Sequence, residues 1–228
     1  MRFSVVPILL ALNLVVFIMW LILGESQFML ENFLVSWSAL EQGRWWTLLT
    51  SEFSHLWFLH IFLNMFVLVN FGPIVEMTIG SGRFVRFYLL AAIVSSISHA
   101  AVSKYLLHQP DLPALGASGA ISGVVVLFAF LYPRARLLLL GLIPMPALVG
   151  VLAFVGLDAL GLFAQTEGGG LPIGHGAHLG GAATGFLFYL LAIRGLGLRR
   201  PQPIDFGKVS TWRALIAQTP PPEYDRRL

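Results

Sequence analysis

Long, uninterrupted runs of apolar residues fill most of this chain and leave it few ways to fold. A helix needs roughly 20 mainly apolar residues to cross a membrane, and six stretches meet that need. They run over Val5–Leu23, Leu56–Val75, Phe84–Leu106, Gly116–Tyr132, Leu137–Phe163 and Ala177–Ile193. Because the runs are continuous and do not alternate with polar residues, helices are expected rather than barrel strands. The sequence therefore predicts an all-α membrane protein with six transmembrane helices.

The composition agrees with a lipid-facing chain and excludes several functions. Of the 228 residues, 57% are hydrophobic and 11% are charged, against roughly 25% charged in a soluble domain. So few charges cannot cover a globule in water, which argues against a soluble enzyme, a disordered chain and a nucleic-acid-binding protein. The chain has no cysteine, and this excludes disulfides, thiolate metal sites and a cysteine nucleophile.

The basic residues predict the orientation of the helices, because Lys and Arg concentrate in cytoplasmic loops. If the N-terminus is cytoplasmic, 12 of the 14 basic residues fall on that side, and only Arg44 and Lys104 lie outside. Both termini are then cytoplasmic, and the second, fourth and sixth helices run from outside to inside. Residues 1–198 would form the membrane domain, and the polar, Pro-rich residues 199–228 a flexible cytoplasmic tail.

Two segments do not read as simple loops or helices. The external segment over about residues 24–55 is rich in Trp and Phe, which collect at bilayer interfaces. We expect it to lie partly in the outer leaflet, and a small cap packed on the helix ends is the alternative. The fifth stretch contains Pro144 and Pro146 near its start, and these predict a kink or an interfacial start of that helix.

Polar side chains gather where three of the predicted helices begin. His60 and Asn64 lie near the start of the second helix, Ser118 at the start of the fourth and His178 at the start of the sixth. Polar groups are costly inside a bilayer and face the protein interior, so each is a candidate for a functional site. Because the three helices run in one direction, these residues should share one shallow depth below the outer surface.

Ser118 and His178 offer the chemistry of a nucleophile and a base. A serine hydroxyl is a poor nucleophile until a neighbouring base takes its proton. Pairs of small residues four apart follow both side chains and would let the helix backbones approach closely. These pairs are Gly119 with Gly123 and Gly181 with Gly185. His60 and Asn64 share one helical face and could donate hydrogen bonds to an oxyanion beside the Ser118 amide.

Each of these residues alone has a simpler explanation, and other functions compete. A serine in a Gly-rich helix usually packs, and a histidine in a membrane often bridges helices. A metalloprotease would need better ligands than His60 with Asn64, and the chain has no HExxH motif. An intramembrane aspartyl protease needs two carboxylates that share a site, and only Asp158 is expected to lie deep. A transporter is expected to show inverted repeats, and the sequence shows no repeat. The joint arrangement favours a serine hydrolase without an acidic third member.

The motifs that carry these residues resemble the rhomboid family of intramembrane serine proteases. The resemblance rests on motifs that lie on different predicted helices, in the order and spacing of the bacterial six-helix core. They are Gly116-Ala117-Ser118-Gly119, Ala177-His178-Leu179-Gly180-Gly181, His55 followed by His60 to Asn64, Trp46 to Ser51, and Gly72, Glu76, Gly80 and Gly82. The similarity covers about residues 45–193.

The resemblance implies a Ser118/His178 dyad, with His60, Asn64 and the Ser118 amide as the oxyanion hole. It implies scaffold roles for a further set of residues: His55, Gly116, Gly119, Glu76 and Gly181. It also implies cleavage of transmembrane protein substrates near the outer membrane face, contact with membrane lipids, and no metal or cofactor. The first loop would be membrane-embedded, the fifth helix would be the substrate gate, and the location would be the bacterial inner membrane. A catalytically inactive relative that binds transmembrane clients is the alternative.

The sequence departs from the family pattern at two positions. Relatives commonly have Arg after the Trp of the first loop, where this chain has Thr47. Many also have an aromatic residue four positions after the serine, where this chain has Ser122, so either another group orients His178 or its ring is held less tightly. Asp158 is expected either to pair with a histidine or to lie at the interface, and His99 to pack between helices. His175 and His108 are expected outside and solvated.

Overall fold

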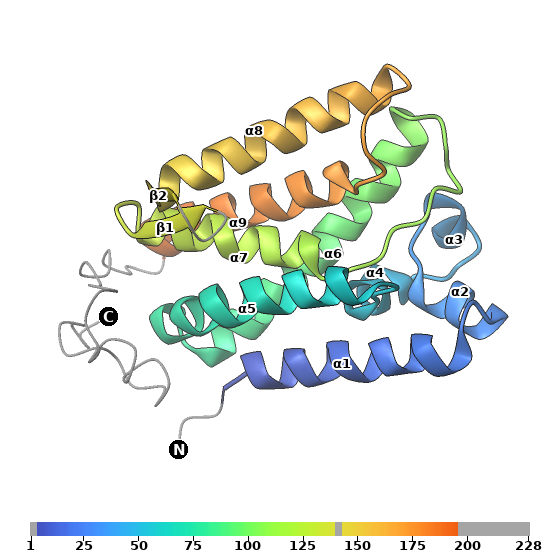
Figure 1. The fold of residues 1–228 in the computed structure, drawn as a ribbon, viewed down its shortest axis with the longest axis horizontal. Helices are drawn as coiled ribbons and strands as arrows, with labels where there is room; N and C mark the ends of the chain where they lie inside the picture. Colours follow the sequence, from blue (N-terminus) through green and yellow to red (C-terminus); the bar gives the residue numbers. More distant parts are fainter. Residues whose placement is uncertain (1–3, 140–142, 196–228) are drawn as a thin grey trace.

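The computed structural model describes residues 4–139 and 143–195, and the predicted tail over residues 199–228 lies outside them. These described residues are all-α apart from one pair of short strands, which confirms the predicted fold class (Figure 1). Six longer helices form the bundle: α1 (Val6–Leu23), α5 (Phe58–Ile79), α6 (Ser81–Tyr105), α7 (Ser118–Leu131), α8 (Ala147–Thr166) and α9 (His175–Gly195). Short helices fill the first loop: α2 (Gln27–Phe33), α3 (Trp37–Glu41), α4 (Thr47–Thr50) and η1 (Ser51–Phe53).

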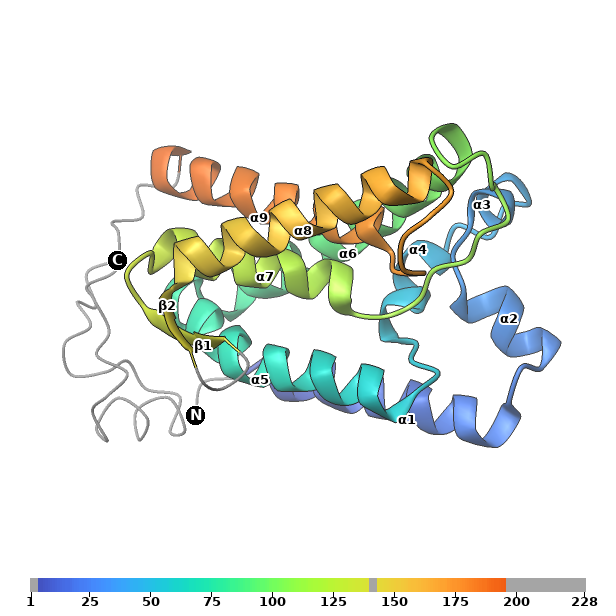
Figure 2. The same cartoon turned by 45° about the horizontal axis from the view of Figure 1, so that its top comes forward.

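Four helices in the described ranges are long and apolar enough to cross a membrane, namely α1, α5, α6 and α8. The helix α7 is apolar but has only 14 residues. The starts of α5, α7 and α9 all point towards the end of the bundle that holds α2, α3 and α4 (Figures 1 and 2). The structure thus gives these three helices the common direction that the sequence predicted, while six membrane crossings and cytoplasmic termini stay predictions.

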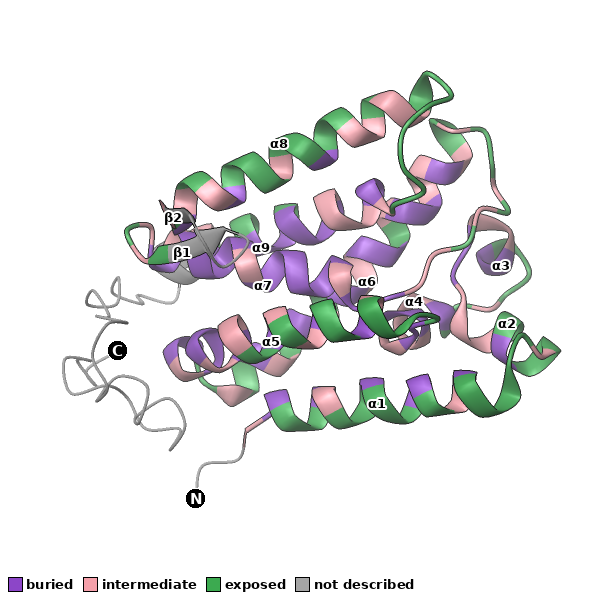
Figure 3. Ribbon diagram, in the orientation of Figure 1, coloured by how far each residue is buried: buried purple, intermediate pink, exposed green. Residues whose placement is uncertain are grey.

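The helix α7 occupies the centre of the bundle, and its burial explains its composition. Eleven of its 14 residues are buried, so it can be apolar on every face. The helix α8 is the opposite case, since only Ala147, Val151 and Asp158 of its 20 residues are buried. Figure 3 shows this contrast between a central helix and one at the edge of the bundle. The large exposed side chains of α8 are apolar, as a helix facing lipid requires.

The start of the fifth apolar stretch is not helical, and the predicted span from Leu137 is wrong there. Strand β1 (Arg136–Leu139) pairs antiparallel with β2 (Ile143–Pro146), and α8 begins only at Ala147. The two prolines of this segment lack the N–H that a helix interior needs. Pro146 instead takes an extended conformation immediately before the helix. Of the two effects predicted for the prolines, a kink is not what the structure shows. The helix instead starts later, directly after Pro146.

Close backbone contacts join α7 to α9. A Cβ on Gly123 would lie 2.9 Å from the carbonyl oxygen of Gly181. A Cβ on Gly181 would overlap the carbonyl oxygen of Gly119, and one on Gly185 would overlap that of Gly123. The small-residue pairs read from the sequence therefore face each other across one interface, and this interface brings the starts of the two helices together.

Candidate active site

Ser118 is the first residue of α7, and the turn before it depends on glycine. Gly116 has a φ of 114°, a conformation that glycine adopts without strain. Its N–H donates to the carbonyl oxygen of Ser51 over 2.9 Å, and a Cβ at this position would lie 2.6 Å from Cε1 of His60. The turn is therefore held against the first loop on one side and against α5 on the other.

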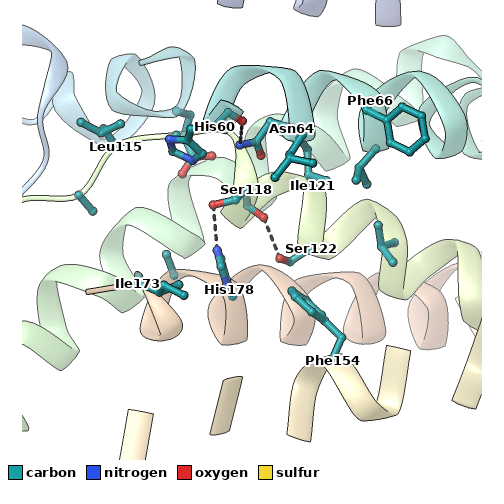
Figure 4. Close-up of a pocket in the computed structure, with 18 of the residues that line it drawn as sticks. His60, Asn64, Phe66, Leu115, Ser118, Ile121, Ser122, Phe154, Ile173 and His178 are labelled. Carbon is teal, nitrogen blue, oxygen red and sulfur yellow. Dashed lines mark hydrogen bonds between the residues drawn. The ribbon is translucent and has the colours of Figure 1, made fainter. Parts of the chain in front are cut away.

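His178 faces Ser118 from the first turn of α9. Its Nε2 lies 2.9 Å from Oγ of Ser118, which is hydrogen-bonding distance (Figure 4). Both side chains are half-buried, and both line a cavity of ≈1230 Å³. The two residues that the sequence put forward as nucleophile and base are thus brought together, with access to a space that could hold a substrate segment.

His60 and Asn64 reach the same cavity from α5, on the other side of Ser118 from His178 (Figure 4). The Nδ2 group of Asn64 donates to the backbone carbonyl of His60 over 2.9 Å, which leaves its second N–H for another acceptor. The imidazole of His60 packs edge-on against that of His55, with the ring centroids 4.7 Å apart. His55 is fully buried, and burial lowers its pKa to about 3.

Asp158 is buried and accepts hydrogen bonds from two histidines of α9. Its Oδ1 lies 3.0 Å from Nδ1 of His178 and 2.7 Å from Nδ1 of His175. The sequence left open whether Asp158 pairs with a histidine or lies at the membrane interface, and in the structure it pairs with histidine. The expectation that His175 is solvated is wrong, because its side chain is buried against α8 at Gly161. His108, in contrast, is exposed as expected.

The hydroxyl of Ser122 bonds within its own helix, and an aromatic ring from another helix lies beside His178. The hydroxyl of Ser122 donates to the carbonyl of Ser118 over 2.7 Å. Phe154 of α8 places its ring beside the imidazole of His178, with centroids 5.8 Å apart and planes inclined by 33° (Figure 4). Thr47 is the other position that differs from the family pattern. It is buried and donates to the carbonyl of Arg44 over 2.6 Å.

Glu52 is a buried carboxyl behind the start of α7, and no sequence pattern indicated it. It accepts hydrogen bonds from Oγ of Ser95 over 2.6 Å and of Ser96 over 3.2 Å, and the N–H of Ala120 lies 3.4 Å away. Burial raises the pKa of Glu52 to about 8. The short segment around Glu52 has no periodicity that would mark it as buried, so only the fold brings it to α7.

Glu76 and His99 make contacts between elements. Glu76 accepts hydrogen bonds from the N–H groups of Val5 and Val6 at the start of α1, over 2.8 and 3.2 Å. It also accepts from the hydroxyl of Ser81 at the start of α6, over 2.6 Å. Nε2 of His99 lies 3.1 Å from the carbonyl oxygen of Leu112, in the loop that leads to the Ser118 turn. Glu76 therefore joins α1, α5 and α6, and His99 joins α6 to the loop before Ser118.

One group of residues in the described ranges could hold a metal ion. Asp158, His175 and His178 offer ligand atoms that all lie within 4.8 Å of one another. In a tetrahedral zinc site with bonds near 2 Å, neighbouring ligand atoms lie roughly 3.3 Å apart. The carboxylate oxygen is closer than that to both imidazole nitrogens, so direct hydrogen bonds describe this group better than a metal site.

The fold and the site define a helical integral membrane protein with a Ser–His pair at the starts of two central helices. The chain belongs to the rhomboid family, since residues 42–195 match the rhomboid domain. It is similar to the mitochondrial RHOMBOID-like protein 12 of Arabidopsis thaliana, with 36% identity over 184 residues, 75% of this chain and 53% of that protein.

Two further relatives are similar over comparable lengths of this chain. The mitochondrial Rhomboid protein 1 of Saccharomyces cerevisiae is 31% identical over 187 residues, 81% of this chain and 52% of that protein. The Rhomboid protease GluP of Bacillus subtilis is 33% identical over 171 residues, 75% of this chain and 29% of that protein. The chain thus spans about half the length of the first two relatives and less of the third.

Proposed function

We propose that this protein is an intramembrane serine endopeptidase in which Ser118 is the nucleophile and His178 the base. The observation that carries the proposal is the 2.9 Å separation between Oγ of Ser118 and Nε2 of His178 beside a cavity. A relative named as a protease adds support. An inactive client-binding protein is the weaker alternative, because it would not need this pair in contact.

The chemistry follows from the two atoms in contact. Oγ of Ser118 attacks the carbonyl carbon of the scissile bond while its proton passes to Nε2 of His178. The tetrahedral intermediate collapses as the imidazolium gives that proton to the leaving amine, and an acyl-enzyme remains. Water then attacks the ester with His178 again as base, and the product acid and Ser118 are released. No metal or cofactor takes part in these steps.

The negative charge of the tetrahedral intermediate needs hydrogen-bond donors close to Ser118. The proposal assigns this role to the side chains of His60 and Asn64 and to the N–H of Ser118. The N–H groups at the start of a helix have no partner within the helix and carry a partial positive charge. Because α7 starts at Ser118, its end would favour an oxyanion at this place.

The proposed substrates are transmembrane proteins, cleaved near the outer membrane face. The cavity is lined mainly by apolar residues of α5, α7 and α8, which suits a segment that leaves lipid. The first loop over about residues 24–55 would lie in the outer leaflet, where the exposed Trp45 and Trp46 would meet the interface. Cytoplasmic termini follow from the basic residues. The expectation that the protein lies in a bacterial inner membrane is weakened, because two of the relatives are named as mitochondrial.

The test uses the full chain purified in detergent and in liposomes, with a fluorogenic transmembrane substrate and a serine-reactive phosphonate probe. Ser118→Ala and His178→Ala should abolish cleavage, and Ser118→Ala should also abolish labelling, while the helical content stays that of the wild type. Ser98→Ala, in a packing position on α6, and His108→Gln, on the surface, are matched controls that should cleave normally. Wild-type cleavage by Ser118→Ala would rule out the mechanism, and an inactive wild type would favour the client-binding alternative.

A further inference from the structure

The helix α8 contains a single acidic residue, which is buried against His178. Asp158 is the only ionisable residue of α8, and it is 4% exposed. A carboxylate in such a place is costly unless it is hydrogen-bonded or paired. Since most of α8 faces outward, a role for Asp158 must be sought on its inward side.

We propose that Asp158 is a positioning residue that converts the Ser118/His178 pair into a triad. The inference rests on the proposed function, and it assigns a role that neither the family resemblance nor the comparisons supply. Asp158 touches no reacting atom. It acts through His178, whose ring it would hold in one orientation and one protonation pattern.

The hydrogen bonds at the two nitrogens of His178 define that pattern. Nδ1 lies 3.0 Å from the carboxylate of Asp158, and Nε2 lies 2.9 Å from Oγ of Ser118. A carboxylate only accepts hydrogen bonds, so Nδ1 must carry the proton in the neutral ring. Nε2 then presents a lone pair to the serine hydroxyl, which is the form a general base requires. The carboxylate also stabilises the imidazolium that forms when the proton arrives.

The carboxylate is itself fixed in place by a second histidine. Nδ1 of His175 lies 2.7 Å from the same oxygen of Asp158. The ring of His175 sits where a Cβ at Gly161 would be, so any larger residue at that position of α8 would overlap it. Gly161 follows Asp158 by three residues and therefore lies on the same face of α8. The helix α8 thus provides both Asp158 and, at Gly161, the space that the ring of His175 needs.

Phe154 contributes a second constraint on His178 from the same helix. It precedes Asp158 by four residues, one helical turn, and its ring lies beside the imidazole with centroids 5.8 Å apart. Asp158 thus holds the edge of the ring at Nδ1, and Phe154 restricts its tilt. Together they supply from α8 the orientation that Ser122, bonded to its own backbone, does not supply from α7.

The first experiment compares steady-state kinetics of Asp158→Asn, Asp158→Glu and Leu157→Ala in liposomes. Asn keeps the size but can turn its NH₂ towards Nδ1, which favours the wrong form of the ring. We expect kcat to fall by about 10²–10⁴-fold with KM within about twofold of the wild type. Asp158→Glu should recover part of kcat because it restores a carboxylate. Leu157→Ala, at an exposed neighbouring position, should behave as the wild type.

A second measurement does not depend on activity and needs no substitution at Asp158. Protein labelled with ¹⁵N-histidine, in the Ser118→Ala background, reports which ring nitrogen of His178 carries the proton near neutral pH. A proton on Nδ1 in a hydrogen bond to a carboxylate is the expected result, and a proton on Nε2 with bare Nδ1 would overturn the proposal. The resonance is assigned by its loss in His178→Gln.

The outcomes separate this inference from the proposed function. If Ser118→Ala and His178→Ala abolish cleavage while Asp158→Asn keeps the wild-type kcat and KM, the positioning role is wrong and the dyad stands. If Ser118→Ala still cleaves, the proposed function fails, and the nitrogen signals alone then decide the hydrogen bond. Loss of activity with a chelator and its return with zinc would show a metal site at Asp158, His175 and His178, and would overturn the proposal.

Discussion

Gly181 of α9 approaches Gly119 of α7 so closely that no side chain fits between them. A Cβ built on Gly181 would overlap the carbonyl oxygen of Gly119, which belongs to the backbone and cannot turn aside. Because Gly119 and Gly181 are next to Ser118 and close to His178 in sequence, this contact sets the spacing of the two helices where the site lies. The separation of the proposed nucleophile and base therefore depends on main-chain contact.

Gly181→Ala should destabilise the protein and separate the two helices. Forcing extra volume into a packed interface costs about 1–3 kcal/mol or more, so the midpoint of thermal unfolding in detergent should fall by about 5 °C. Cleavage should fall as well, even at temperatures where the variant is folded. Gly82→Ala is the matched control, since a Cβ at Gly82 meets nothing within 4 Å. Equal midpoints for the two variants would contradict the packing argument.

Glu52 should make stability depend on pH in the direction opposite to an ordinary carboxyl. Its pKa in the folded protein is about 8, above the ordinary value of 4.5. Between these values the folded state binds a proton that the unfolded state has lost, so stability falls as pH rises. We expect the contribution of Glu52 to lower the unfolding midpoint progressively from about pH 5 to about pH 8. In Glu52→Gln, which keeps an acceptor for Ser95, this decrease should flatten.

His55 affects the pH dependence of stability in the opposite direction, so the pH range of the measurement must exclude its contribution. Its folded pKa of about 3 lies below the ordinary 6.5, and its contribution to stability is complete above the ordinary value and is lost as pH falls. Measurements between about pH 6.5 and 8 therefore isolate Glu52 from His55. A wild-type midpoint that stays level in that window, or matches Glu52→Gln throughout it, would show that Glu52 is charged in the folded state.

His60→Ala and Asn64→Ala should each slow turnover without unfolding the protein. Loss of one donor to an oxyanion typically lowers kcat by about 10²–10³-fold, and KM should change little because the donor acts on the transition state. Asn32→Ala is a matched control, since Asn32 makes the same bond to a carbonyl four residues earlier, over 2.9 Å, and does not line the cavity. Unchanged kcat in both site variants would remove them from the proposed oxyanion hole.

Glu76→Ala should loosen the start of α1 from α5 and α6. The substitution leaves buried N–H groups of Val5 and Val6 without their acceptor, and each such group costs about 1–3 kcal/mol. Limited proteolysis near the N-terminus should accelerate, and the unfolding midpoint should fall. The unfolding midpoint should fall less in Glu76→Gln, because the amide carbonyl still accepts one hydrogen bond while the NH₂ group faces donors. A Glu76→Ala variant as resistant to protease as the wild type would contradict this scaffold role.

The helices and the Ser118/His178 contact could be anticipated from the sequence, because each depends on local patterns. Continuous apolar runs predict helices with ends correct to within a few residues, except at the start of the fifth stretch, and the common direction of α5, α7 and α9 follows from their order. The pairing of β1 with β2 could not be predicted, because strand pairing joins separate residues and leaves no mark in a short apolar run. Only the prolines indicated that this segment differs.

The surroundings of the site were less predictable, since they depend on how helices rotate about their axes. Asp158 lies 20 residues from His178 in sequence, and whether it points inward or to the interface depends on the facing of α8. The same uncertainty led to His175 being expected in solvent. Glu52 had no pattern at all, because the segment from Ser51 to Phe53 is a single short turn whose burial follows from the packing of α6 and α7 around it.

The edge helix α8 combines two properties that were described separately. It faces outward over most of its length and borders the cavity, and it also holds Phe154 and Asp158 against His178. A substrate that pushed α8 outward to enter would withdraw both side chains from the imidazole and so meet an enzyme with an unaligned base. Cleavage would then wait until α8 returned, and entry and bond breaking would become ordered steps in time. Segments that lodge without letting α8 close would act as inhibitors.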